Sequence, residues 1–221
     1  MHRAHPQVRR STFATVAFLS ALALAPLQSQ PGMPSSSMPS ASLGPGGLRE
    51  PAWSPDGKRL AVVFLDRIWT VAPDGHDSKP LDSARDPAPP TTVQRDPAWA
   101  PDGTRIAFAM DRGEGFDIHV ARTKGGTPER VTTAAGDERG PSWTPDGRLV
   151  FAQRESDAGQ WDLFIVSPGA EGGWDPPVRL TDTPDREVEP RVSPDGTRLA
   201  FASDRDNDDG KDQSADADRD V

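Results

Sequence analysis

The segment EPAWSPDGKRLAVVF, residues 50–64, decides the fold because the chain repeats it. Related segments begin at Asp96 (DPAWAPDGTRIAFAM), Gly140 (GPSWTPDGRLVFAQ) and Glu189 (EPRVSPDGTRLAFAS). The prolines of the four Pro-Asp-Gly triplets are 46, 44 and 49 residues apart. Because a period of this length built from short strands is typical of stacked β-sheet units, we expect one supersecondary unit to recur four times.

The Pro-Asp-Gly triplet has the chemistry of a tight turn between two strands. Proline presets φ at the second turn position, aspartate hydrogen-bonds to nearby backbone amides, and glycine accepts the left-handed conformation. We therefore interpret the repeated aspartates as turn residues rather than as a carboxylate constellation. The predicted structural turn residues are Pro55, Asp56, Gly57, Pro101, Asp102, Gly103, Pro145, Asp146, Gly147, Pro194, Asp195 and Gly196.

A large apolar residue precedes each turn, and β-forming residues follow it. Trp53, Trp99 and Trp143 occupy the same place in three copies, so we expect them to pack one unit against the next rather than to form a ligand platform. Two further strands follow in each period, separated by turns at residues 73–75, 125–126 and 172–173. Four antiparallel strands per period predict an all-β fold, a β-propeller with four-stranded antiparallel blades.

The pattern Pro-x-Trp-Ser-Pro-Asp-Gly-x-x-Leu-Ala-Phe, followed by Gly-Gly and Leu-Thr, resembles the TolB-type, WD-like β-propeller repeat over residues 49–221. The predicted blades are residues 49–94, 95–138 and 139–187, with a partial blade at 188–221. Copy four departs from the pattern at Arg191-Val192. The third-strand tyrosine of the family is replaced by Trp69, His119 and Phe164. We expect neither departure to change the fold.

The first 48 residues have a different composition from the repeats. Residues 1–10 carry three arginines and no acid, and residues 13–27 are almost wholly apolar, which is typical of a signal peptide and too short for a lasting transmembrane helix. We predict a signal peptide at 1–29 and a flexible Pro/Ser/Gly linker at 30–48. The expected location is outside the cytoplasm, periplasmic or extracellular, with no stable membrane span after signal cleavage and the export route left open.

The last copy reads as an unfinished blade. Two predicted strands lead into an aspartate-rich stretch, and the final Asp220-Val221 resembles the start of a third strand. We therefore expect about three and a half blades, forming the N-terminal part of a longer exported protein. Asp204, Asp206 and Asp208 have calcium-loop spacing, but Asp209 stands where such loops have glycine and no glutamate closes the loop. A solvated insertion and a calcium site remain the two interpretations.

The composition and the absence of known motifs argue against several classes of partner and catalytic site. The chain has no cysteine, and its 34 acidic and 25 basic side chains give a net charge of −9, which argues against nucleic acid as the main partner. No Gly-x-Ser-x-Gly, His-x-His, His-Glu-x-x-His or glycine-rich phosphate loop is present. We expect no catalytic residue and no cofactor in this chain. We interpret His119 as a core residue of its blade and His76 as a solvated residue after a turn.

Two functional hypotheses follow from the resemblance. It implies an exported, non-catalytic propeller that binds a protein or peptide through its rim or central opening. Similar propellers are also joined to hydrolases, namely prolyl-oligopeptidase-like or tricorn-like peptidases and some amidohydrolases, in which case a catalytic domain would lie beyond Val221. Fold analogy alone does not choose between them, and the oligomeric state stays open. A calcium-stabilised adhesion domain is a third option.

Overall fold

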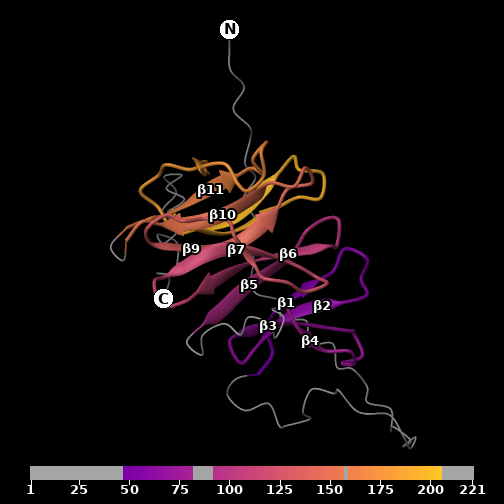
Figure 1. Cartoon of the computed structure of the whole chain (residues 1–221). Coiled ribbons are helices and arrows are strands. Elements are labelled where there is room, and N and C mark those ends of the chain that lie inside the picture. The colour runs from indigo at the N-terminus through magenta and orange to yellow at the C-terminus, as the bar shows by residue number, and fades with distance from the viewer. Residues whose placement is uncertain (1–46, 82–91, 157–158, 206–221) are drawn as a thin grey trace, which may run out of the picture.

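A computed structural model describes residues 47–81, 92–156 and 159–205, which form fourteen β-strands and no helix (Figure 1). The strands build three four-stranded antiparallel sheets and one two-stranded sheet. We call these sheets blades A to D in chain order. They follow one another through space from indigo blade A to yellow blade D (Figure 1).

Each blade is made from consecutive strands of one repeat. Blade A contains β1 (Arg49–Trp53), β2 (Leu60–Phe64), β3 (Arg67–Val71) and β4 (Lys79–Pro80). Blade B contains β5 (Val93–Trp99), β6 (Arg105–Asp111), β7 (Phe116–Arg122) and β8 (Glu129–Arg130). Blade C contains β9 (Asp137–Trp143), β10 (Leu149–Arg154), β11 (Trp161–Val166) and β12 (Val178–Arg179). Blade D contains β13 (Glu187–Val192) and β14 (Leu199–Ser203).

The first strand of each blade lies against the first strand of the next. β1 contacts β5, β5 contacts β9, and β9 contacts β13. The fourth strands β4, β8 and β12 are exposed at the opposite edge of their sheets. Strands β5, β9 and β13 begin at Val93, Asp137 and Glu187, one or two residues ahead of the blade boundaries expected at 95, 139 and 188. These added residues reach into the preceding blade, as described below.

The second strands of blades B and C are buried on both faces because each lies between two blades. The five central residues of β6 are all buried, and so are the first five of β10, which explains their nearly continuous apolar sequence. Phe108 and Phe151 are fully buried there. In the same position β14 has a similar sequence, LAFAS, but no residue of it is buried. Burying a phenylalanine contributes about 1.5–3 kcal/mol, so the outer face of blade D lacks stabilisation that blades B and C have.

Two hydrophobic clusters join the blades. One contains Val63 and Ile68 of blade A with Phe108 and Met110 of blade B. The other joins blades B and C and includes Ile118, Trp143 and Phe151. The predicted fold class is confirmed: over its described residues the chain is an all-β, incomplete β-propeller of antiparallel blades.

Several predicted segments lie outside the described residues. They are the signal peptide at 1–29, most of the linker at 30–48, and the aspartate-rich stretch from residue 206 onward. Within residues 47–81, 92–156 and 159–205, no helix has the length and apolar composition that a membrane crossing needs.

Candidate functional site

The four Pro-Asp-Gly turns share one hydrogen-bonding scheme. In blade A, Asp56 accepts hydrogen bonds from the Ser54 hydroxyl at 2.7 Å and from the Lys58 amide at 3.1 Å. Equivalent bonds hold Asp102, Asp146 and Asp195 in the other copies. The four turn glycines have φ between 68° and 87°, the left-handed region that glycine adopts without strain.

These carboxylates are held as anions. The Arg148 guanidinium, followed by the Thr144 hydroxyl, lowers the pKa of Asp146 to about 2. The Ser193 hydroxyl, followed by the Thr197 amide, lowers the pKa of Asp195 to about 2. A carboxylate already satisfied by its own turn is a poor proton donor near neutral pH, so the geometry gives these residues a structural task.

Two of the three repeated tryptophans connect neighbouring blades. The Trp99 indole N–H donates to the Ala52 carbonyl at 3.0 Å, and the Trp143 indole N–H donates to the Ala98 carbonyl at 3.1 Å. Trp53, expected to pack in the same way, is 58% exposed. The difference arises because no blade among the described residues lies on that side of blade A.

A further series of joints lies at a bulge in each first strand. Glu50, Asp96, Gly140 and Glu189 all have φ between 52° and 63°, and the strand pairing shifts at each of them. The Asp96 amide donates to Glu50 Oε2 at 2.6 Å, and the Gly140 amide donates to Asp96 Oδ2 at 3.0 Å. Arg139 also pairs with Asp96 at 2.7 Å. The acid before proline recurs in three of the four repeats, so the sequence carried a signal for these joints that our sequence analysis did not use.

In blades B, C and D, the third residue before the proline that follows the bulge is fully buried. Gln94 Oε1 accepts the Ile68 amide at 2.8 Å. Glu138 takes the same place in blade C, where its Oε2 accepts from the Thr132 hydroxyl at 3.0 Å. Its Oε1 is buried without a hydrogen-bond partner. Burial, only partly offset by the Thr132 hydrogen bond, raises the pKa of Glu138 to about 8. No residue pattern predicted this buried acid.

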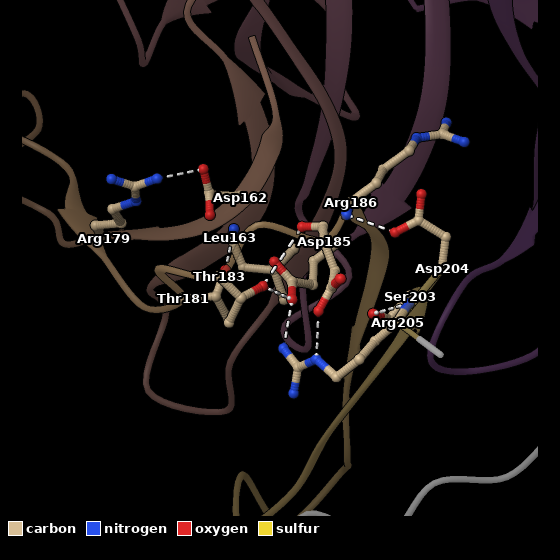
Figure 2. A network of polar contacts seen from close by, with 11 residues as sticks. Asp162, Leu163, Arg179, Thr181, Thr183, Asp185, Arg186, Ser203, Asp204 and Arg205 are labelled. Atoms are coloured by element: carbon tan, nitrogen blue, oxygen red, sulfur yellow. Dashed lines mark hydrogen bonds and ion pairs between the residues drawn. The ribbon is translucent and has the colours of Figure 1, made fainter. Parts of the chain in front are cut away.

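A polar network joins the two strands of blade D to the segment that leads into them from blade C (Figure 2). The Arg205 guanidinium donates to Asp185 at 2.7 Å and to buried Glu187 at 2.9 Å. The Thr183 hydroxyl also donates to Glu187, and the Arg186 amide donates to Asp204 at 2.6 Å. Arg205 thus ties the end of β14 to the segment that enters β13. At the position that Trp99 and Trp143 occupy in the other joints, the Val192 amide donates to the Ser142 hydroxyl of blade C at 3.0 Å.

Two candidate residues that the structure describes, Asp204 and His119, have structural contacts. Asp204 is bound to the Arg186 amide, while Asp206 and Asp208 lie outside the described residues, so the calcium site stays a hypothesis. In the described ranges, no three His, Asp or Glu side chains are grouped so that they could hold a metal ion. His119 is 4% exposed and stacks on Phe108, and burial lowers its pKa.

Four-stranded antiparallel sheets that meet through their first strands define an incomplete β-propeller. Solved structures have the same fold. A protein assigned as TolB in Agrobacterium tumefaciens matches with 24% identity and a TM-score of 0.58, covering 72% of this chain and 54% of that one. TolB of Acinetobacter baumannii matches with 22% identity and a TM-score of 0.57, covering 71% and 37%. A puromycin hydrolase matches with 20% identity and a TM-score of 0.52, covering 69% and 24%.

The chain therefore has the fold of a TolB-type β-propeller, and it spans about half and about a third of the lengths of these two TolB proteins. No protein-family model matches the chain, and no curated protein matches it.

Proposed function

We propose that the chain is an exported propeller module that binds a protein or peptide segment. The observation that carries the proposal is an open groove of about 740 Å³ between blades A and B. Its lining combines an indole, hydroxyls and both signs of charge, contributed by Thr70, Lys79, Trp99, Asp102, Thr123 and Lys124 among others. Mixed surfaces of this kind, with an aromatic side chain and polar groups, suit polypeptide recognition.

The binding role is tested by photo-crosslinking in cells. A benzoylphenylalanine at Lys124, beside the groove, is expected to capture the same polypeptide in repeated experiments. The matched control places it at Glu171, on the exposed loop between β11 and β12 of blade C. Equal capture at both positions, or none at Lys124, contradicts binding at this groove.

Export is a separate part of the proposal and has its own test. The arginines and apolar run of residues 1–29 support it. Fusion of residues 1–48 to a β-lactamase that lacks its own signal is expected to give ampicillin resistance. Replacing the apolar run by polar residues is expected to abolish that resistance.

The second candidate is the propeller of a hydrolase, favoured by the likeness to the puromycin hydrolase fold. It requires further coding sequence after Val221. A Gly-x-Ser-x-Gly or His-x-His motif there supports this candidate, whereas further Pro-Asp-Gly repeats followed by a stop codon support the binding module.

A further inference from the structure

The joint between blades B and C contains a buried tryptophan that is contacted by an aromatic ring and a guanidinium group. Trp143 is 6% exposed. The ring of Trp174 lies 6.2 Å from it between centroids, and the Arg105 guanidinium lies 4.7 Å from its centroid. Trp174 belongs to the segment that connects β11 to β12, and its Asp175 neighbour is fixed through the Ser167 carbonyl at 2.9 Å. An aromatic side chain and a cation therefore close this joint.

The same joint between blades A and B is open. Trp99 takes the place of Trp143 and is only half-buried, at the side of the 740 Å³ groove. Within the described part of the chain, neither an aromatic ring nor a guanidinium group contacts its ring. Arg59 takes the repeat position of Arg105, but it donates at 2.7 Å to the Asp77 carboxylate and at 2.7 Å to the Asp77 carbonyl. Asp77 thus holds the cation elsewhere.

The contact from an aromatic ring is missing because the connecting segments differ. Blade C joins β11 to β12 through residues 167–177, SPGAEGGWDPP, which supply the aromatic ring. Blade B joins β7 to β8 through residues 123–128, TKGGTP, which carry no aromatic residue. In that shorter segment, Thr123 and Lys124 line the groove instead. The equivalent tryptophans therefore differ: Trp143 is contacted by the ring of Trp174, whereas Trp99 faces the groove.

We propose that the groove receives an aromatic side chain from an extended segment of a partner protein, and that this ring packs against Trp99 as Trp174 packs against Trp143. This inference rests on the binding function proposed above and names the chemistry of the ligand. An acidic residue next to the aromatic one pairs with Lys124, which is exposed and has no ion-pair partner among the described residues. Lys79 is already paired with Asp77 at 2.8 Å. The recognised segment is aromatic followed by acidic, as in Trp174-Asp175.

The chain itself supplies the probe, the peptide Gly-Gly-Trp-Asp-Pro-Pro, with both ends blocked. Each of the six tryptophans gives an indole N–H resonance in ¹⁵N spectra of the full chain, and Trp99→Phe assigns the one of interest. We expect the peptide to shift the Trp99 indole and Lys124 amide resonances with a Kd of about 1 mM or tighter. The same peptide with alanine in place of tryptophan is expected to cause no shift.

Two variants separate this site from any other aromatic surface. Insertion of Trp-Asp after Gly126 places the missing ring in the groove and is expected to abolish peptide binding, whereas insertion of Gly-Ser is expected to leave it. Lys124→Glu is expected to weaken binding roughly two- to fivefold, as for an exposed ion pair.

Three results overturn the inference: no shift at about 5 mM peptide, well above the expected Kd; shifts centred on exposed Trp53; or binding that survives the Trp-Asp insertion. The two proposals fail separately. Peptide binding without cellular crosslinks removes the binding function in the cell and leaves the groove chemistry. Reproducible crosslinks from another surface, without peptide binding, remove the groove chemistry alone.

Discussion

Replacement of Glu138 by glutamine is expected to stabilise the chain, increasingly as the pH rises. Glu138 is fully buried between blades B and C, with one carboxyl oxygen bonded to Thr132 and the other without a partner. Gln94 occupies the same place between blades A and B, so glutamine fits this environment in the native chain. Glutamine keeps an acceptor for Thr132 and removes the ionisable group.

The magnitude follows from the raised pKa. Burial moves the pKa of Glu138 from 4.5 to about 8, so between these values the folded chain keeps a proton that the unfolded chain has released. The free energy of unfolding therefore falls as the pH rises from 4.5 to about 8, at most by roughly 1.4 kcal/mol per pH unit, or about 5 kcal/mol in all. Water entry and screening reduce that limit, and we expect about 2–3 kcal/mol at pH 8. Near pH 4.5 the variant and the native chain should be equally stable.

Urea unfolding followed by far-UV circular dichroism measures the effect at intervals between pH 4.5 and 8. Glu129→Gln, at an exposed position of β8 in the adjacent blade, is the matched control and should leave the pH profile unchanged. The turn carboxylates of Asp146 and Asp195 do not contribute to the change in stability between pH 4.5 and 8. Their pKa values near 2, below the ordinary 3.8, mean that their stabilisation is present above pH 4 and is lost as the pH falls toward 2. Parallel profiles for Glu138→Gln and the native chain would refute a buried, protonated Glu138.

Two further pairs of variants test the joints. Glu189 has φ of 55°, and its side chain makes no hydrogen bond to another described residue, so Glu189→Gly is expected to raise the free energy of unfolding by about 0.5–1 kcal/mol. Asp96→Gly relieves the same backbone strain but removes the acceptor for the Gly140 amide, and it should lower stability by about 1–3 kcal/mol. Equal urea midpoints for these two variants would contradict a stabilising hydrogen bond between the Gly140 amide and Asp96. Trp143→Phe loses an indole hydrogen bond and ring contacts and should cost roughly 1–3 kcal/mol, whereas Trp53→Phe should cost almost nothing. A thermal melt that ranks them in the reverse order would contradict the packing.

The blades could be predicted because their information is local and repeated. The Pro-Asp-Gly triplet defines a turn by its own chemistry, and its spacing defines the unit, so neither depends on distant contacts. The exposure of Trp53 could not be read from its repeat position, because burial depends on whether another blade lies against it. The same sequence position is buried at Trp143 and exposed at Trp53.

The groove and the buried acid depend on side-chain contacts that the repeat pattern does not encode. Arg59 pairs with Asp77 of the same repeat instead of contacting Trp99, and the repeat pattern does not indicate that pairing. Glu138 follows a turn-rich segment, and its sequence neighbours are charged, which is typical of a solvated residue. Only the preceding blade, which contributes Thr132, makes this site buried. The sequence therefore predicts the unit well and the joints between units poorly.

The stacking of each blade on the next is tested most directly by nuclear Overhauser contacts of the indole N–H protons. Serial stacking places the Trp99 indole N–H at Ala52 and the Trp143 indole N–H at Ala98, each in the preceding repeat. We expect strong contacts between these two pairs and none from Trp53 to blades B and C. Contacts of Trp143 with Ala52, or of each indole only within its own repeat, would contradict the stacked arrangement.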